Sequence, residues 1–368
     1  MVSGRGGGGG GPGGRTAQAR PRQSDIARAA GVSQTTVSLV LGGNKAGVVL
    51  AEDTKRRVLE AAESLGYAPD PVATRLASAR NDMLGLFTFS ATFPTEVAHS
   101  YYPVLVGVEE EAAALGQDLI LFTGSSGAAS RAADPAAVRR VRVADGCLFF
   151  GRHVPTEQIE RLARDGYPFV YIGRRDELGE RVPYVGADYV PASAEVVRRL
   201  ADLGHRRVRY VRENDDAPAS ADRERGVLAG ARECGIDTDG LVVRTDGSDI
   251  TAERVRAWRA EGVTALVTEE TDTAAALSAL TGAVEAAGLD CPRDVSLAVL
   301  GDPPASGSAF AHISGFTVPR REMGRRAVRL LVELVTGDPG LPAPPLQQLV
   351  PCEPVPGRTI GPAPSPAP

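Results

Sequence analysis

The sequence predicts an α/β protein in which a small all-α headpiece and a hinge helix precede two Rossmann-like lobes. Three observations predict this class. Residues 20–80 read as short helical segments with apolar residues at helical spacing. From residue 81 onward, short apolar strands alternate with helices, which is typical of parallel sheets covered on both faces. This alternation restarts after residue 188, which indicates two lobes with a ligand cleft at the carboxyl ends of their strands.

The first 19 of the 368 residues are rich in glycine and include six consecutive glycines. A glycine run of this kind could indicate a phosphate-binding loop, but no strand pattern precedes it and no GK[ST] follows it. Residues 1–19 are therefore expected to form a flexible, disordered tail.

The stretch from Gln23 to Leu41 predicts two short helices joined by a tight turn. Ile26 and Ala30 lie on one apolar stripe, and Gly31 supplies the left-handed position that ends the first helix. Ser33 is expected to cap the second helix, whose other face carries short polar side chains that can reach base edges. This is the helix-turn-helix arrangement, with the second helix presented to a major groove. The alternative is an ordinary helical hairpin in a protein core.

A third helix is predicted in EDTKRRVLEAAESLGY. One face of this segment carries four apolar residues, Val58, Ala61, Ala62 and Leu65, and Gly66 ends it. A further short helix follows, with Asp70 and Pro71 at its start.

The order of these elements resembles the DNA-binding headpiece of the lactose/galactose repressor (LacI-type) family. The resemblance rests on DIARAAGVSQTTVSLVL, RRVLEAAESLGYAPD and VATRLAS, and a weaker similarity runs to about residue 358. It implies a helix-turn-helix headpiece at 20–68, a hinge helix at 69–80 and a two-lobed, periplasmic-binding-protein-like body at 81–352, which binds an effector and forms the dimer. The Pro-rich residues 353–368 are expected to be disordered.

The resemblance places the DNA contacts on the second helix and the hinge helix. These contacts are Ser33, Gln34, Thr35, Thr36, Ser38, Leu39, Arg75 and Leu76. Leu39 stands where many family members have an arginine suited to guanine, so it either touches a thymine methyl or only packs. Leu76 is expected to enter the minor groove as a wedge, the alternative being a dimer contact. Arg22 stands at the usual hydroxyl cap of the first helix, so either Ser24 replaces that cap or the helix starts less firmly.

The resemblance also implies the effector contacts in the cleft. These are Tyr101, Tyr102, Arg174, Arg223, Glu270 and Asp302. SADRERG is similar to the segment whose arginine, here Arg223, clamps ligand hydroxyls, and VLGDPP is similar to a GFDD-type turn that keeps its first acid as Asp302. TEET stands where an AND-type sequence is common, so Glu269 or Glu270 replaces a neutral amide. The alternatives are a surface position for Arg223, a turn cap for Asp302, and core or interface positions for the two tyrosines.

The distribution of charge agrees with a DNA-contacting head on an acidic body. Residues 15–80 hold ten Lys and Arg against six Asp and Glu, whereas residues 81–368 hold 30 against 40. The four cysteines and four histidines are scattered without metal-ligand spacing, so we expect no metal, disulfide framework or cofactor. No apolar run reaches about 20 residues and no signal-peptide pattern opens the chain, so no membrane partner and a cytoplasmic, nucleoid-associated location are expected.

We interpret the sequence as that of a homodimeric transcriptional regulator, a repressor rather than an enzyme. Each subunit would read one half of a near-palindromic double-stranded operator. An effector in the cleft, a sugar or related polar metabolite, would change the lobe arrangement and the operator affinity. A periplasmic-type ligand-binding protein without a DNA role is the alternative, but it leaves the headpiece unexplained. An enzyme on the same scaffold would need a GxGxxG after a strand or a nucleophile–base pair, and neither is visible.

Overall fold

The computed structural model divides the chain into two compact units, residues 1–81 and 82–368, and each is described by itself. The described residues are 21–41, 50–67, 80–88, 102–122, 139–151, 156–176, 179–271, 273–303, 310, 312–337 and 345–364. The glycine-rich tail at 1–19 and, apart from residue 80, the hinge helix at 69–80 lie outside these ranges, so both stay predictions.

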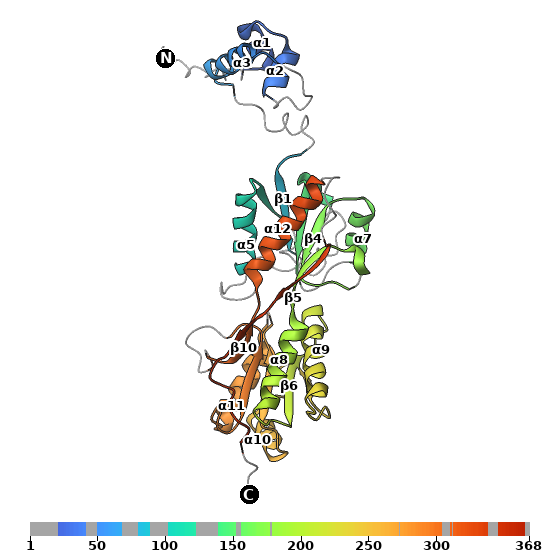
Figure 1. Ribbon diagram of the computed structural model, residues 1–368, viewed down its shortest axis with the longest axis vertical. Coiled ribbons are helices and arrows are strands. Elements are labelled where there is room, and N and C mark those ends of the chain that lie inside the picture. Colours follow the sequence, from blue (N-terminus) through green and yellow to red (C-terminus); the bar gives the residue numbers. More distant parts are fainter. Residues whose placement is uncertain are drawn as a thin grey trace, which may run out of the picture. The chain divides into compact units, whose positions relative to one another are not determined.

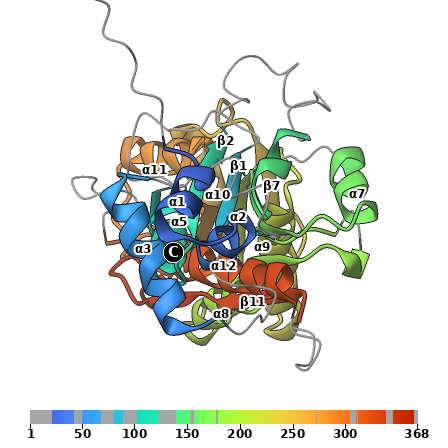
Figure 2. The same cartoon turned by 90° about the horizontal axis from the view of Figure 1, so that it is seen from above.

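The described residues of the first unit form a headpiece of three helices (Figures 1 and 2). Its helices are α1 (Gln23–Ala30), α2 (Gln34–Leu41) and α3 (Glu52–Ser64). Their shared core consists of Ile26, Ala27, Ala30, Val37, Val58, Ala61 and Ala62. Gly31 ends α1 at a φ of +65°, which confirms the predicted turn. Leu65 was expected on the buried face of α3 but is 38% exposed, because it lies just beyond the last helical residue.

The first lobe of the body contains six parallel strands in the order β11–β5–β4–β3–β1–β2. The strands are β1 (Met83–Thr88), β2 (Asp118–Phe122), β3 (Gly146–Phe150), β4 (Phe169–Ile172), β5 (Tyr184–Asp188) and β11 (Gln347–Pro351). The accompanying helices are α5 (Tyr102–Ala114), α7 (Thr156–Arg164) and α12 (Arg320–Thr336), with short 3-10 helices η1 (Arg140–Val143) and η2 (Gly179–Arg181). Strands β1, β3 and β4 are buried almost throughout, as their continuous apolar runs predict.

The second lobe repeats this plan with strands in the order β12–β10–β9–β8–β6–β7, parallel except for the antiparallel β10–β12 pair. Its strands are β6 (Val208–Glu213), β7 (Val242–Thr245), β8 (Ala265–Glu269), β9 (Ser296–Leu300), β10 (Ser314–Thr317) and β12 (Glu353–Val355). Its helices are α8 (Tyr189–Asp202), α9 (Pro218–Glu233), α10 (Ala252–Ala260) and α11 (Ala275–Ala287). The predicted alternation of strands and helices is confirmed in both lobes.

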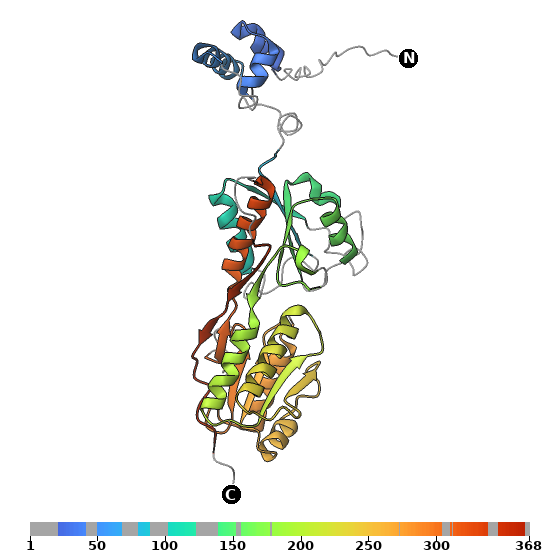
Figure 3. The same ribbon diagram turned by 45° about the vertical axis from the view of Figure 1, so that its right-hand side comes forward.

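Three segments cross between the lobes (Figures 1 and 3). They connect β5 to α8, β10 to α12, and β11 to β12. Helix α12 returns the chain to the first lobe, where it packs on α5, β3, β4 and β5. The crossing of α5 and α12 is close because both helices have glycine there: a Cβ on Gly324 would lie 2.5 Å from the carbonyl oxygen of Val104.

The expectation of a disordered tail from residue 353 is wrong for residues 353–364. Strand β12 pairs with β10, and Thr359 is buried beyond it. The Thr359 amide and hydroxyl both bond to Ser314, and the hydroxyl donates to the Leu297 carbonyl at 2.6 Å. Proline content alone predicted disorder, whereas these hydrogen bonds fix the segment against the amino ends of the strands of the second lobe.

Candidate functional site

The predicted recognition helix α2 exposes short polar side chains. Gln34, Thr35 and Ser38 face solvent, and Leu39 is half-buried. Val37, on the other face, is fully buried in the headpiece core. The apolar face of α2 therefore packs in the headpiece core, and its polar face is exposed to solvent. Arg75 and Leu76, the predicted hinge contacts, lie outside the described residues.

Helices α1 and α2 are capped at their N-termini by different groups. Ser33 caps α2 as predicted, since its Oγ accepts from the Thr36 amide at 3.1 Å and lies 2.9 Å from the Thr36 hydroxyl. Thr36 is half-buried and partly occupied by this cap. In α1, Ser24 does not act as the cap: the Arg22 amide donates to Asp25 Oδ2 at 2.9 Å, so an acidic first turn replaces the hydroxyl.

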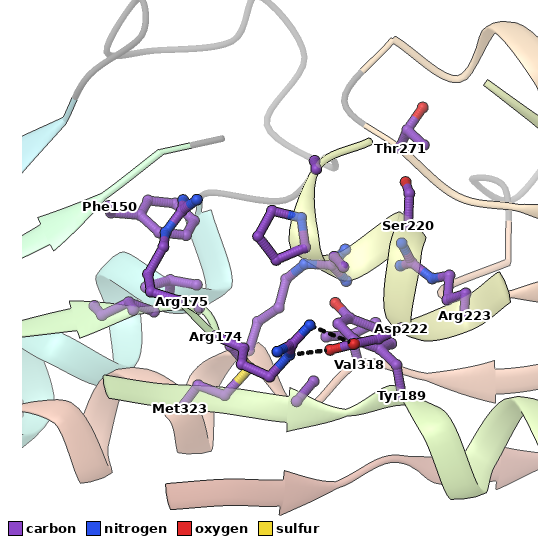
Figure 4. A pocket seen from close by; sticks show the side chains of 18 of the residues that line it. Phe150, Arg174, Arg175, Tyr189, Ser220, Asp222, Arg223, Thr271, Val318 and Met323 are labelled. Carbon is purple, nitrogen blue, oxygen red and sulfur yellow. Dashed lines mark hydrogen bonds and ion pairs between the residues drawn. The ribbon is translucent and has the colours of Figure 1, made fainter. Parts of the chain in front are cut away.

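A cavity of about 150 Å³ lies between the two lobes of the body, at the carboxyl ends of their strands (Figure 4). The first lobe contributes Val104, Phe150, Ile172, Arg174, Arg175, Ala187 and Met323 to its wall. The second lobe contributes Pro218, Ser220, Asp222, Arg223, Glu270 and Thr271. The crossing segments contribute Tyr189, Val318 and Arg320.

Arg223 is the least satisfied charged group of this wall. Its residue is 3% exposed, and its guanidinium lies 4.2 Å above the ring centre of Tyr189. Nη1 and Nη2 lie 4.0 Å and 3.9 Å from Glu269 and Glu270, too far for hydrogen bonds, and Nε has no partner. Burial disfavours its charged form, but Tyr189 and the two carboxylates raise its pKa. A charged guanidinium therefore faces the cavity with no hydrogen-bond acceptor among the described residues.

The two adjacent glutamates have different surroundings. Glu270, a predicted effector contact, lines the cavity. Glu269 is fully buried behind it, where its carboxylate accepts from the Tyr210 hydroxyl at 3.2 Å and from the Glu213 amide at 3.1 Å. Of the two alternatives that the sequence left open, Glu270 is the one on the cavity wall.

Asp302 is held by a crossing segment and is absent from the cavity wall. Its Oδ1 accepts from the Val318 amide at 3.0 Å, and its Oδ2 accepts from Arg320. Arg320 also donates to Glu270 Oε2 at 2.6 Å. Asp302, predicted as an effector contact, instead binds Arg320 and the Val318 amide.

Arg174 lines the cavity and is paired across it. Its Nε and Nη2 donate to the two carboxylate oxygens of Asp222, the second at 2.5 Å, and its Nη1 donates to Asp176. Figure 4 shows the Arg174–Asp222 pair. Tyr102 is 54% exposed at the start of α5 and does not line the cavity, and Tyr101 lies outside the described residues.

The cavity residues that the sequence did not single out include three that hold or contact charged groups, namely Tyr189, Asp222 and Arg320. Asp222 immediately precedes the predicted Arg223, and a carboxylate beside a cleft arginine was a usable signal. Arg320 and Tyr189 open helices that follow crossing segments, and only the three-dimensional path of these segments brings them to the cavity.

Other kinds of site find no support in the described part of the chain. Within these ranges, no group of three or more His, Cys, Asp and Glu side chains is placed to hold a metal ion. A search of the same residues finds no helix with the length and apolar character needed to cross a bilayer.

Comparison with known proteins assigns both units. Residues 24–70 match the model of bacterial regulatory proteins of the lacI family, and residues 197–360 match a periplasmic binding protein-like domain. The regulator MalR of Streptomyces coelicolor is 30% identical over 338 residues, covering 86% of this chain and 91% of MalR. CelR of Thermobifida fusca is 29% identical over 328 residues, covering 87% and 93%.

Solved structures agree in fold. A CelR–cellobiose complex has a TM-score of 0.61 at 24% identity and covers 93% of this chain and all of that one. The lac repressor dimer bound to operator and the anti-inducer ONPF has a TM-score of 0.67 at 20% identity and covers 92% and 99%. The headpiece, the two-lobed body and these similarities lead to one conclusion: the chain belongs to the lacI family of bacterial regulatory proteins.

Proposed function

We propose that this protein is a homodimeric repressor that binds a near-palindromic operator through α2 and is controlled by a neutral polyhydroxyl effector in the cavity between its lobes. The observation that carries the effector half is Arg223, a buried, charged fork of donors that meets no hydrogen-bond acceptor among the described residues. The headpiece carries the DNA half. The enzyme alternative has no support, since the relatives are transcriptional regulators.

The DNA-contacting residues that we propose are Ser33, Gln34, Thr35, Thr36, Ser38 and Leu39. Gln34, Thr35 and Ser38 are solvent-facing on a helix whose opposite face is buried, which is the presentation that base reading in a major groove requires. Leu39 offers only an apolar contact, so we expect a thymine methyl rather than a guanine opposite it.

The effector class follows from which cavity groups are already satisfied. Arg174 and Arg320 hold carboxylates, and Arg175 donates to the Tyr171 hydroxyl and the Gly151 carbonyl. Arg223 is left to donate, and Glu270, whose Oε2 lies 3.9 Å away and already accepts from Arg320, has its other carboxylate oxygen left to accept. A hydroxyl group can satisfy both, whereas an anion would face Glu270 and Asp222. A sugar is such a compound, and the relative CelR was solved with cellobiose.

The operator half is tested by selecting sites from a random duplex pool with the full-length protein. We expect near-palindromes whose affinity falls steeply with salt, since basic groups release counterions from phosphates. Gln34→Ala and Thr35→Ala should each lose about 1–3 kcal/mol of discrimination at one base position. Recovery of only asymmetric or single-stranded sequences would refute this half.

The effector half is tested on the preformed operator complex with three sets of compounds: neutral mono- and disaccharides, sugar phosphates, and sugar acids. We expect the neutral compounds to contain the one that changes operator affinity. A response confined to the phosphates or acids would refute the proposed class.

The hinge helix is a further part of the proposal, although Arg75 and Leu76 lie outside the described residues. Paired leucines in the minor groove would open a base step and bend the duplex, as other apolar wedges do. Leu76→Ala should weaken operator binding by about tenfold or more and reduce bending, with effector affinity unchanged. Unchanged bending and affinity would exclude the wedge.

A further inference from the structure

The Arg174–Asp222 pair joins the two lobes at a point where the chain itself does not. Arg174 follows β4 of the first lobe, and Asp222 lies in α9 of the second lobe. Two donors of one guanidinium meet both oxygens of one carboxylate, and the two side chains are only 12% and 3% exposed. Because the pair is bidentate and largely shielded from solvent, it constrains the relative position of its two partners more than an exposed ion pair does.

Both partners are held by rigid elements. The amide of Arg174 is pressed against β5, because a Cβ on Gly186 would lie 2.9 Å from that nitrogen. Helix α9 is pressed against α8 in the same way, because a Cβ on Gly226 would lie 2.4 Å from the Val190 carbonyl oxygen. These close contacts tie the backbone of each partner to its own lobe, so only the two side chains could span a separation of the lobes.

The ion pairs of Arg320 differ from the Arg174–Asp222 pair in how the chain connects the partners. Arg320 also reaches acids of the second lobe, but it begins α12 three residues after β10. Asp302 holds the amide of Val318 on the same crossing segment. Arg320 is tethered three residues from β10, whose neighbour β9 ends just before Asp302, so we expect its pairs to tolerate a rotation of the lobes better than the Arg174–Asp222 pair.

We propose that the Arg174–Asp222 pair is a latch that keeps the two lobes closed around the cavity before any effector binds. The latch rests on the proposed function only in assigning an effector to that cavity. It has a consequence for binding: a cavity whose two walls are already in place presents Arg223 and Glu270 together, so the effector does not have to supply the free energy of closure.

The test is the distance between the lobes in the unliganded, full-length protein. Spin labels are placed at Ala163 in α7 and Ala260 in α10, both exposed, by an unnatural amino acid that avoids the native cysteines. Labelled subunits are diluted with excess unlabelled protein, so that pulsed electron spin resonance reports distances within one subunit. The test variants are Arg174→Gln and Asp222→Asn, one in each lobe.

The chain offers a matched control for each variant. Asp176→Asn removes the pair that Arg174 makes inside the first lobe, and Arg225→Ala removes the pair that Asp222 makes inside the second lobe. Arg174→Gln and Asp222→Asn should shift the labels to longer distances and lower the ratio of closed to open molecules by about 10–150-fold, as loss of a hydrogen bond between charged groups implies. The controls should match the wild type.

The double variant Arg174→Gln with Asp222→Asn should open the lobes no further than either single variant, because both remove one interaction. Unchanged or shorter distances in the two single variants would overturn the latch, and so would equal shifts in the two controls. Neither operator nor effector enters this measurement, so its failure is distinct from failure of the proposed function.

Discussion

Replacing Arg223 by methionine tests the centre of the candidate effector site. Methionine keeps much of the length and all of the apolar character of the side chain, so its contact with the Tyr189 ring is retained in part. What is lost is a charged donor with no hydrogen-bond partner among the described residues. One hydrogen bond from a charged group to a ligand contributes about 1.5–3 kcal/mol, so the effector Kd should rise roughly 10–150-fold.

The substitution should also destabilise the fold. Arg223 lies about 4 Å from two buried carboxylates, and although burial disfavours its charged form, its pKa is raised, so the attraction of Tyr189 and the carboxylates outweighs burial. Arg223→Met therefore removes the positive charge beside Glu269 and Glu270, of which Glu270 still binds Arg320. The assay is effector titration against the operator complex, with thermal unfolding alongside. Arg232→Met, an exposed position on the same helix, is the control. A wild-type Kd in Arg223→Met would refute the assignment, as would equal losses in both variants.

Three further predictions concern stability. Ser33→Ala should lower the unfolding free energy of the headpiece by about 1 kcal/mol, measured by thermal melting, because α2 loses its cap; an unchanged melt would exclude that role. Gly324→Ala should lower the unfolding free energy of the body by about 1–3 kcal/mol, because the added Cβ forces α5 and α12 apart. The control Gly282→Ala, where the added Cβ meets no atom within 4 Å, should be neutral or stabilising. Equal effects of the two substitutions would contradict the close crossing. His205 is fully buried and its pKa is lowered, chiefly by burial, so the unfolded chain binds a proton at a higher pH than the folded chain does. The contribution of His205 to stability should therefore be complete above about pH 6.5 and fall as the pH drops below that value. Denaturant titrations that give the same unfolding free energy across this pH range would contradict the prediction.

Local chemistry allowed much of the fold to be predicted from the sequence. Continuous apolar runs marked the strands because parallel sheets bury both faces, and Gly31 and Ser33 marked the turn of the headpiece because each has a specific backbone role. Strands β10, β11 and β12 were missed. They are three to five residues long, and prolines and polar residues interrupt their apolar pattern, so only their neighbours in the sheets define them.

The candidate site was predicted less completely, for a physical reason. Arg174, Arg223 and Glu270 were predicted from the family resemblance, and each lies just after a strand or in a helix that begins at the carboxyl edge of a sheet. Their partners were not found. Asp222 is 48 residues from Arg174, and Arg320 is 18 residues from Asp302, so both pairings depend on how the lobes and crossing segments come together. No local pattern records that geometry.

The most direct test of regulation through the cavity is the reciprocity of the two binding events. Operator affinity is measured with and without the effector found among the neutral compounds, and effector affinity is measured with and without operator. Because the two sites share one linked equilibrium, both ratios must equal one coupling factor, expected at about 5–150-fold. Arg223→Met should show that change of operator affinity only at correspondingly higher effector concentrations. An effector that binds the wild-type cavity and leaves operator affinity unchanged would contradict the account.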